Sequence, residues 1–513
     1  MQKFIFGLDV GGINIKAGIF TKNGILLGMS RVKNQILTPK PDRAEISPEY
    51  SWENLPFLIK DSCNKAGINP EDISTVGICS TCPTLVPLDC NGNPLRNAIM
   101  NFDQRSYNLV SKLQNKINMD EIFEITGNRI LSGAISVSSI LWIKENEPQI
   151  YEKTFCFGHI TTYLIYKLTG KFILDYNQAS FTGLFNTKNN FSWNSLLIKK
   201  YGLEKDKLPA LSPPTQAVGT LTKKAASITK LREDVLVAPG SADTVCSALG
   251  IGLIESKKIF ISSGTSEIVS ACLDKPEFDN RFLNRFYIDN LWIFHAATST
   301  SGAAIKWLKS IIDYNKNIID EEFFNLMVNL AKKSEIGSNK LIFLPYLQGE
   351  RSPWWDSSAR GVFFGLSLST TISDICMSIF ESIGFALKQN IRIAEGLLGK
   401  ETDEIFFTGG GSKNSFWLQI KSDIIGKKLK VVDFNETAML GAAILGGICG
   451  GIFKDHLDAI NNTKQKRYFK IKPNLVNYRK YEKISKIFDS LYKSIKHEFK
   501  ELNEIKLGRK ERR

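Results

Sequence analysis

Residues 5–12, IFGLDVGG, place a short apolar run directly before a turn that contains two adjacent glycines. Residues 259–266, IFISSGTS, again place a short apolar run before a glycine turn, in the second half of the chain. Glycine lets the backbone approach a ligand closely and aim several N–H donors at it, which is one way to bind phosphate. Two such turns, one in each half, predict that a nucleotide is held between two lobes.

The length of the chain, 513 residues, predicts two large domains. One hydrophobic core stops growing at about 250 to 300 residues. Strand-like and helix-like stretches alternate through both halves, which is typical of α/β layers. A glycine-punctuated segment, residues 243–256, joins the halves. We therefore expect an N-terminal lobe at residues 1–248, a C-terminal lobe at 249–455, and a terminal helix with a basic tail at 456–513.

Periodicity and turn residues predict the individual elements. Ile375, Ile379, Ile383 and Leu387 recur every four residues, which indicates a helix with one buried face behind Ser373 as its N-cap. The expected helices cover residues 52–65, 137–145 and 374–398, and the expected strands cover 3–9, 18–20, 73–78 and 235–238, with others near Ile259, Trp292 and Leu341.

The net charge of +14 does not by itself indicate a nucleic-acid partner. Lysines are scattered among acidic residues along most of the chain. The one concentrated basic block, residues 506–513, contains no aromatic residue. We therefore expect a solvated tail there and no nucleic-acid partner.

Cysteine use and hydropathy predict a cytoplasmic protein. Nine cysteines at irregular spacing suit reduced thiols. Cys79 and Cys82 form a C-x-x-C pattern, but the chain has only four histidines and no second such pair, so we interpret the pattern as packing. No apolar run reaches the roughly 20 residues of a membrane helix. We expect no membrane partner and keep a homodimer as a candidate assembly.

The usual phosphate-binding motifs are missing from the chain. It contains no G-x-x-x-x-G-K-[ST] motif, no G-x-G-x-x-G after a strand and no H-R-D motif. Two aspartates stand out instead: Asp9 at the first glycine turn, and Asp243 at the end of the run GSAD. Phosphoryl transfer requires Mg²⁺ and a group that accepts the proton of the attacking hydroxyl. The aspartates fit these two roles, and a strand-end cap or turn residue is an equally weighted alternative for each.

Several segments beyond the turns carry a family resemblance. Residues 361–366, GVFFGL, and 374–381, DICMSIFE, meet the second signature of the FGGY family of carbohydrate kinases. Nearly the whole chain resembles that family, and its second half is most similar to xylulose kinases. The resemblance implies an α/β fold of the actin-like, sugar kinase and Hsp70 ATPase type, with two lobes built from duplicated ribonuclease H-like domains. Further matching runs are 344–353 (LPYLQGERSP), 408–414 (TGGGSKN), 436–443 (ETAMLGAA), 175–180 (DYNQAS) and 101–105 (NFDQR).

The resemblance also implies ATP and Mg²⁺ as cofactors, a sugar as substrate, and roles for individual residues. Asp243 would be the catalytic base, and Asp9 would help to hold Mg²⁺. Lys306 would lie on the wall opposite the adenosine-side loop. The implied nucleotide-binding residues are Gly11, Gly12, Lys16, Gly264, Thr265, Gly302, Gly409, Gly410, Gly411 and Asn414. The implied sugar-binding residues are Thr84, Asp103, Arg105, Asp175, Asn177 and Asp243.

The chain departs from the family pattern at two turns. Ile13 and Asn14 follow Gly12 where hydroxyl side chains are usual, so fewer hydroxyls face the phosphates. Xylulose kinases usually carry Met-His-Gly where this chain has Cys-Pro-Thr at residues 82–84. Pro83 cannot make the hydrogen bond of that histidine to a sugar hydroxyl.

These departures leave the substrate open. D-xylulose, converted to D-xylulose 5-phosphate, is the leading expectation, with another pentulose, a polyol or a sugar acid as alternatives. The rival from another class is a nucleotide-gated sugar sensor or chaperone-like ATPase without sugar kinase activity. Retention of both Asp9 and Asp243 argues against that rival.

Overall fold

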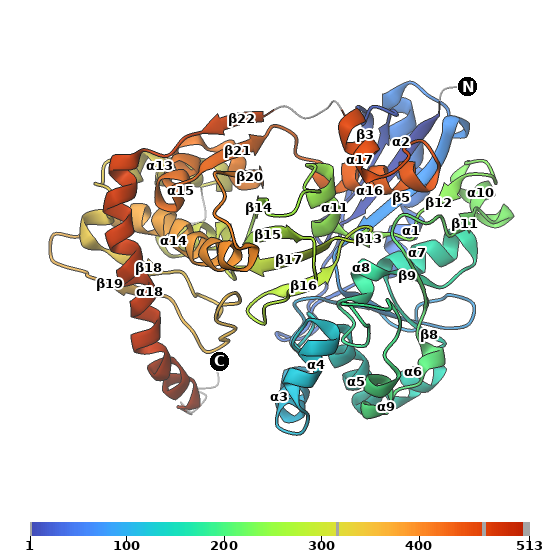
Figure 1. The fold of residues 1–513 in the computed structure, drawn as a ribbon, viewed down its shortest axis with the longest axis horizontal. Helices are drawn as coiled ribbons and strands as arrows, with labels where there is room; N and C mark the ends of the chain where they lie inside the picture. The colour runs from blue at the N-terminus through green and yellow to red at the C-terminus, as the bar shows by residue number, and fades with distance from the viewer. Residues whose placement is uncertain (1–2, 314–317, 464–467, 506–513) are drawn as a thin grey trace. The chain divides into compact units, whose positions relative to one another are not determined.

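The computed structural model describes residues 3–313, 318–463 and 468–505, so the basic block at 506–513 lies outside the described residues. The contacts divide the chain into two compact units (Figure 1). Each unit is discontinuous in sequence. The first unit comprises Met1–Ser256, Cys272–Phe294 and Glu436–Lys466, and the second comprises Lys257–Ala271, His295–Asn435 and Arg467–Arg513.

The first unit is built on a seven-stranded mixed sheet of order β11-β12-β5-β1-β2-β3, with β13 also paired to β5. Strand β1 is antiparallel to β2 and parallel to β5, and all seven residues of β1 are buried. The strands are β1 (Phe4–Val10), β2 (Asn14–Phe20), β3 (Leu26–Lys33), β5 (Ile73–Ser80), β11 (Gly219–Thr220), β12 (Leu236–Val237) and β13 (Ser241–Ala242).

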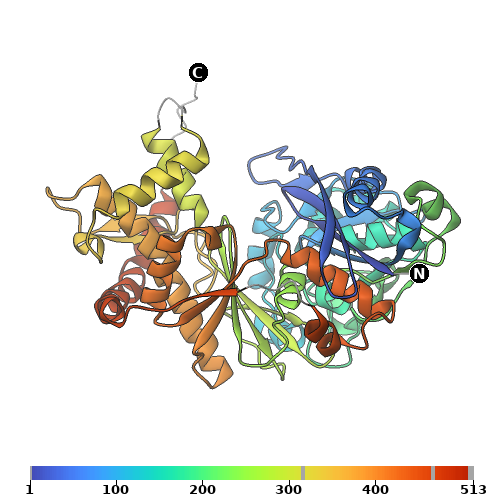
Figure 2. The ribbon, with the colours of Figure 1, turned by 90° about the horizontal axis from the view of Figure 1, so that it is seen from above.

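Helices α2 (Leu55–Ala66) and α16 (Thr437–Cys449) cover opposite faces of this sheet (Figure 2). A Cβ atom on Gly28 would meet the backbone of α2, and one on Gly18 would meet Met439 of α16. Gly28 pairs with Ile19, the neighbour of Gly18, and successive strand residues point to opposite faces. A helix from the last quarter of the chain thus closes the core begun by the first strands.

Glycines set how closely α16 approaches its neighbours. A Cβ on Gly77 of β5 would lie 1.8 Å from the carbonyl oxygen of Ala442 in α16. Where α16 crosses α11 (Asp243–Gly250), a Cβ on Gly441 would lie 1.9 Å from the carbonyl oxygen of Cys246. These contacts are with backbone atoms, which cannot rotate aside.

Replacing Gly77 by alanine should therefore destabilise the protein. Overpacking a closely packed core costs about 1–3 kcal/mol, and urea denaturation followed by tryptophan fluorescence measures the loss. Gly396, near the end of helix α14 in the second unit, is a matched control because its Cβ would meet no atom within 4 Å. The Gly396→Ala change should be neutral or stabilise by about 0.5–1 kcal/mol. Equal denaturation midpoints for the two variants would contradict the close approach of α16.

Smaller sheets and helices complete the first unit. Strands β4 (Glu45–Ile46), β7 (Ala98–Met100), β6 (Thr84–Leu88) and β8 (Cys156–His159) form one sheet, β9 (Ile173–Asp175) pairs with β10 (Ala210–Ser212), and β16 spans Leu283–Phe286. The other helices are α1 (Pro48–Glu53), α3 (Tyr107–Gln114), α4 (Met119–Thr126), α5 (Ser136–Asn146), α6 (Pro148–Lys153), α7 (Ile160–Thr169), α8 (Tyr176–Ala179), α9 (Ser195–Lys200), α10 (Lys223–Thr229) and α17 (His456–Asn462).

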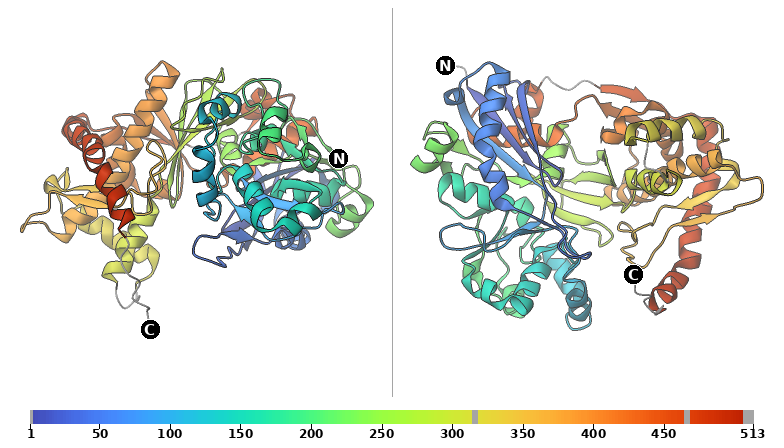
Figure 3. Two further views of the ribbon diagram at one scale, coloured as in Figure 1. Left: turned by 90° about the horizontal axis from the view of Figure 1, so that it is seen from below. Right: turned by 180° about the vertical axis from the view of Figure 1, so that it is seen from behind.

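The second unit carries its own mixed sheet, in which β14 pairs with antiparallel β15 and parallel β20, and β21 pairs with parallel β20 and antiparallel β22. The long helix α18 packs against α14 and α15 (Figures 1 and 3). The strands that lie wholly or partly in this unit are β14 (Ile259–Ser263), β15 (Glu267–Leu273), β17 (Trp292–Ala297), β18 (Ile342–Leu344), β19 (Val362–Phe364), β20 (Glu404–Gly409), β21 (Lys428–Val432) and β22 (Tyr468–Ile471). The helices are α12 (Gly302–Ile312), α13 (Asp320–Ala331), α14 (Ile372–Leu398), α15 (Ser415–Ile425) and α18 (Leu475–Glu504).

The predicted helix at 374–398 is confirmed as α14, but its predicted cap is wrong. Thr371, not Ser373, is the N-cap: its hydroxyl accepts from the amide of Asp374, whose carboxylate in turn accepts from the amide of Thr371. This reciprocal capping box satisfies two backbone donors that a cap at Ser373, two residues further along, would leave open. The predicted elements at 3–9, 73–78, 52–65 and 137–145 are confirmed within a few residues as β1, β5, α2 and α5.

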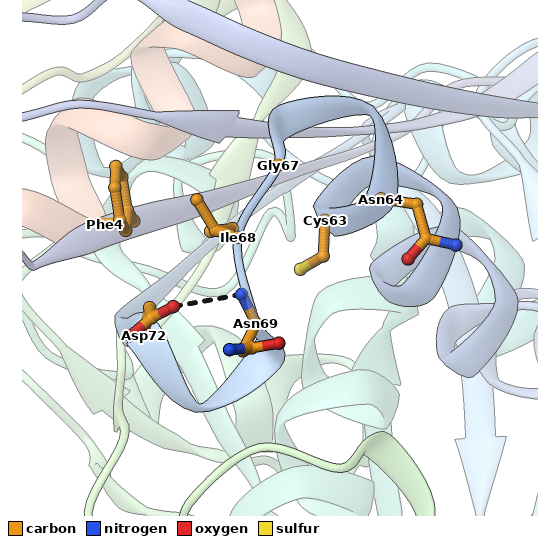
Figure 4. Close-up of a pocket in the computed structure, with 7 residues that line it drawn as sticks. All are labelled: Phe4, Cys63, Asn64, Gly67, Ile68, Asn69 and Asp72. Carbon is orange, nitrogen blue, oxygen red and sulfur yellow. Dashed lines mark hydrogen bonds between the residues drawn. The ribbon is translucent and has the colours of Figure 1, made fainter.

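No helix within the described residues is both long enough and apolar enough to cross a membrane. A hollow of about 490 Å³ opens beside the C-terminal end of α2 (Figure 4). There the amide of Asn69 donates a hydrogen bond to Asp72 (3.0 Å). The lining of this hollow includes none of the predicted site residues: it consists of Phe4, Cys63, Asn64, Gly67, Ile68, Asn69 and Asp72.

Candidate functional site

The strand order of the first unit brings Asp9 and Asp243 together. Asp9 of β1 pairs with Cys79 of parallel strand β5, and Cys79 also pairs with Ser241 of parallel strand β13. Asp243 follows two residues after Ser241, as the first residue of α11. The carboxyl ends of three parallel strands therefore present two aspartates at one edge of the sheet, the edge where α/β proteins bind ligands.

Burial and mutual repulsion disfavour the charged forms of these carboxylates. Burial and the negative charge of Asp243 together raise the pKa of Asp9 to about 7, against the positive charge of Lys16. Burial raises the pKa of Asp243 to about 6, against the amide of Thr244 and the positive charge of Arg285. A buried acid, Asp9, and a partly buried acid, Asp243, that repel one another form a site that a cation would stabilise.

Lys16 lies directly opposite Asp9 on antiparallel strand β2. Its ammonium group makes an ion pair with Glu436, the residue before α16 (2.8 Å). About a quarter of the Lys16 side chain is exposed. The predicted phosphate-side lysine is thus held beside Asp9 by an acid that the sequence analysis did not select.

The first glycine turn closes on itself through backbone hydrogen bonds. The amide of Gly11 donates to the carbonyl of Asn14 (3.0 Å), and the side chain of Asn34 donates to the carbonyl of Gly11 (2.9 Å). A Cβ on Gly12 would lie 3.1 Å from Met100. Ile13 at the tip of the turn is 63% exposed. Because the amide of Gly11 already donates a hydrogen bond within the turn, Gly11 determines the conformation of the turn rather than offering a free N–H donor to phosphate.

Two predicted sugar-binding residues, Asp103 and Arg105, are hydrogen-bonded to each other. Asp103 accepts from the amide of Ala44 (2.7 Å) and from the Arg105 guanidinium at both carboxylate oxygens (2.8 Å each). Arg105 also donates to Glu45 (2.6 Å). All three charged side chains are buried, so in this structure they hold the loop after β7 in place.

Asp175 and Asn177 are likewise buried and engaged. Asp175 is the N-cap of α8, where it accepts from the amides of Asn177 (3.1 Å) and Gln178 (3.2 Å). Burial raises the pKa of Asp175 to about 7, against these hydrogen bonds. The Asn177 side chain donates to the carbonyl of Phe286 (2.9 Å) and accepts from the amide of Ala242, next to Asp243 (3.4 Å). They position the start of α11.

Thr84 and Asp243 differ in accessibility. Thr84 is fully buried, and its hydroxyl donates to the carbonyl of Thr81 (3.0 Å). Asp243 is only partly buried, so of the six predicted sugar-binding residues it alone keeps part of its surface open. The sugar-binding roles stay predictions.

Arg285 is a further residue of this region, and it was not predicted from the sequence. It lies on β16, is 3% exposed, and donates to the side-chain oxygen of Asn177 (3.3 Å). Its positive charge lowers the pKa of both Asp175 and Asp243 from the values that burial would give. The sequence did indicate its burial, because Arg285 begins the otherwise apolar run RFYI, and apolar runs are usually buried.

The second unit contains an apolar pocket of about 210 Å³ with glycines on its walls. Phe324 and Trp417 form one side, with ring centroids 6.1 Å apart. Of the residues predicted to bind nucleotide, four glycines and Lys306 line it. The lining is Gly264, Gly302, Ile305, Lys306, Lys309, Asp320, Phe323, Phe324, Gly410, Gly411 and Trp417.

Family models match both halves of the chain. The model of the N-terminal domain of the FGGY family of carbohydrate kinases matches residues 4–250, and that of its C-terminal domain matches residues 259–449. The chain belongs to the FGGY family of carbohydrate kinases. This FGGY kinase is therefore a phosphotransferase with an alcohol group as acceptor, and its two-domain α/β fold is the actin-like one that the sequence predicted.

The relatives of this FGGY kinase carry several names. The chain is 26% identical over 493 residues to a xylulose kinase of Staphylococcus xylosus, covering 95% of this chain and 99% of that one. It is also 26% identical over 517 residues to a gluconokinase of Bacillus subtilis, covering 99% of both. Among solved structures, a xylulose kinase from Lactobacillus acidophilus superposes with a TM-score of 0.89 at 22% identity, covering 98% of this chain and all of that one.

A buried ion pair underlies the pocket of the FGGY kinase. The ammonium of Lys421 lies 2.6 Å from the carboxylate of Glu267, and both side chains are fully buried. The hydroxyls of Ser263 and Ser301 donate to the same carboxylate oxygen (2.7 and 2.8 Å). Ser263 precedes Gly264, and Ser301 precedes Gly302, so the pair fixes the second glycine turn and the start of α12.

Within the second unit, three of the residues predicted to bind nucleotide do not line this pocket. The backbone of Gly409 adopts φ +94°, and its Cβ would lie 2.2 Å from the carbonyl of Ser263, so glycine is needed there for packing. Asn414 caps α15 by accepting from the amide of Trp417 (2.9 Å). The carbonyl of Thr265 accepts from the amide of Ser301 (2.9 Å). Each of the three shapes the elements around the pocket.

Proposed function

We propose that this kinase transfers the γ-phosphate of ATP to a sugar hydroxyl with Asp243 as general base. The observation that carries the proposal is the convergence of Asp243 and Asp9 at the carboxyl ends of β13 and β1. Asp243 is partly exposed and begins a helix, so its carboxylate can accept a proton from a bound hydroxyl. The oxygen so activated attacks the phosphorus, the bond to ADP breaks, and the proton stays on Asp243.

Asp9 is our candidate for holding Mg²⁺. Within the described residues no three His, Cys, Asp or Glu side chains are grouped so that they could hold a metal alone. Mg²⁺ in kinases, however, is held by one or two carboxylates together with substrate phosphates. The hard oxygen donor of Asp9 and its raised pKa fit that chemistry, because a cation would relieve its repulsion with Asp243. When bound, Mg²⁺ neutralises phosphate charge.

The pocket of the second unit is our candidate for the adenosine side of ATP. Its apolar and aromatic walls suit a base, and Gly264 and Gly302 bring backbone close to the opening. Lys16, Gly11 and Gly12 of the first unit are proposed on the phosphate side. A cytoplasmic location and a homodimer stay predictions.

The phosphorylated compound is proposed to be an acyclic pentulose or a sugar acid. D-xylulose is favoured by the resemblance of the second half of the chain and by relatives named xylulose kinases. A sugar acid is favoured by an equally similar gluconokinase. The Cys-Pro-Thr sequence at 82–84 supports a change of substrate from that of xylulose kinases.

Release of ADP by the purified protein, with ATP and Mg²⁺ and a panel of sugars, tests the proposal. The panel contains D-xylulose, D-ribulose, ribitol, glycerol and D-gluconate, with a reaction without sugar as control. We expect ADP release that depends on one class of compound. Hydrolysis that is independent of sugar, or none with any compound, would favour the sugar sensor or chaperone-like ATPase.

A further inference from the structure

Arg285 is a buried cation on the sugar side of the first unit. Its guanidinium carbon lies 3.5 Å from the centroid of the Phe181 ring, and one terminal nitrogen donates to Asn177 (3.3 Å). The guanidinium also interacts with the sulfur of Cys82, in the turn where this chain departs from xylulose kinases. The side chain is 3% exposed. Arg285 thus lies between two segments that were predicted to contact the sugar.

The hydrogen-bonding capacity of Arg285 is only partly used. A guanidinium has five N–H donors and is always charged. Its Nε atom has no partner among the described residues, and Cys82 offers only a weak acceptor. No carboxylate of the described chain forms an ion pair with it within 4.0 Å. A buried charge without a paired anion is costly, so the side chain is suited to receive an anion from outside the chain.

The nearby carboxylates of the protein have other roles. The carboxylate of Asp175 accepts hydrogen bonds from the amides at the start of α8 and from the hydroxyl of Ser241 (3.4 Å). Asp243 accepts from the amide of Thr244 (2.7 Å). The positive charge of Arg285 lowers the pKa of both acids, but without a direct ion pair. Neither acid therefore pairs with Nε of Arg285, the donor that has no partner among the described residues.

Building on the proposed kinase function, we propose that Arg285 binds the carboxylate of a sugar acid and makes an aldonate the substrate of this enzyme. A carboxylate fits the fork of a guanidinium through two parallel hydrogen bonds, whereas a hydroxyl or ketone leaves the charge uncompensated. Asn177 connects Arg285 to Ala242, the residue before Asp243. One end of an extended polyhydroxy acid would thus be held at Arg285, and a hydroxyl further along would reach Asp243. The carboxylate is unchanged in the reaction, and only the hydroxyl gains the phosphoryl group.

The test compares D-gluconate with D-xylulose for the wild type and for Arg285→Met and Arg285→Lys. The wild type should have the higher kcat/KM for D-gluconate. In Arg285→Met the ratio of kcat/KM for D-gluconate to that for D-xylulose should fall about 10- to 100-fold, as expected for loss of hydrogen bonds to a charged group. Arg285→Lys keeps the positive charge but loses the forked arrangement of donors, so its ratio should lie between those of the wild type and Arg285→Met. Arg232→Met, which removes a surface arginine of the same unit, should leave the ratio unchanged.

Binding of D-gluconate without ATP, followed by tryptophan fluorescence, provides a second readout. We expect a larger dissociation constant for D-gluconate in both Arg285 variants. Thermal unfolding identifies a variant that fails to fold. If Arg285→Met does not fold, the result for Arg285→Lys decides the test. Phosphorylation of D-xylulose but not D-gluconate would overturn the role of Arg285 and leave the kinase function standing. Absence of ADP release with every compound would count against the kinase function. In that case a gluconate dissociation constant unchanged by either substitution would also overturn the inference.

Discussion

Replacing Asp243 by asparagine should lower kcat for sugar phosphorylation by about 10²- to 10⁴-fold, the contribution typical of a positioned general base. Asparagine keeps the size and the hydrogen bond from the Thr244 amide but cannot accept the proton of the attacking hydroxyl. ATP binding should be retained, because the apolar pocket belongs to the second unit. ADP release in a coupled assay measures kcat, and quenching of tryptophan fluorescence measures the nucleotide dissociation constant.

The proposed role of Asp243 as general base predicts that kcat/KM depends on pH. The base must be ionised, and the pKa of Asp243 is raised to about 6 by burial. For the wild type, kcat/KM should therefore be constant above that pKa and fall as the pH decreases through it. Asp206→Asn, a change of an exposed aspartate in the same unit, is the control and should keep the wild-type profile. Full activity of Asp243→Asn would remove Asp243 from the mechanism.

The second large effect should come from Lys421→Met. Methionine matches the lysine in length, but the change leaves the fully buried carboxylate of Glu267 without its positive partner. Breaking one side of a buried ion pair costs about 3–5 kcal/mol. The midpoint of urea denaturation should fall accordingly, and KM for ATP should rise because the same carboxylate fixes Ser263 and Ser301 beside the pocket glycines.

A double variant distinguishes the contribution of the ion pair to stability from that of side-chain packing. Lys421→Met with Glu267→Gln removes both charges while leaving an acceptor for the two serine hydroxyls, so it should be more stable than Lys421→Met alone. Lys470→Met, which removes a surface ion pair with Glu404 in the same unit, should cost no more than about 1 kcal/mol. If the double variant is as unstable as the single one, lost packing rather than an unpaired charge explains the effect.

The sequence predicted those features that depend on local pattern. An apolar run before glycines predicted β1 and β14, and four-residue periodicity predicted α14. Asp9 lies near the end of β1 and Asp243 directly after β13, each beside a glycine-containing stretch, so they could be selected individually. Their convergence could not be read from the chain, because it depends on β5 pairing with both β1 and β13, which are remote in sequence.

The family resemblance identified polar residues of the candidate site but not the side chains to which they are hydrogen-bonded. Asp103 and Arg105 occur in a run shared with the family, yet each satisfies the other in a buried network with Glu45. Such mutual satisfaction depends on side-chain geometry, which sequence does not specify. Arg285 was overlooked for the opposite reason, since it belongs to no motif and its place in an apolar run was the one sign in the sequence of its burial.

The packing of α16 also determines when the first unit can finish folding. The strands that α16 covers and helix α11 are synthesised within the first 250 residues, but α16 itself ends at Cys449. At about 5–20 residues per second, ribosomes need roughly 10 to 40 s more to supply it. Until then the glycine-lined face of β1 and β5 lacks its cover. A nascent chain of this kinase therefore exposes an unfinished core through much of its synthesis, and an N-terminal fragment ending near residue 256 lacks the helix that completes its own sheet.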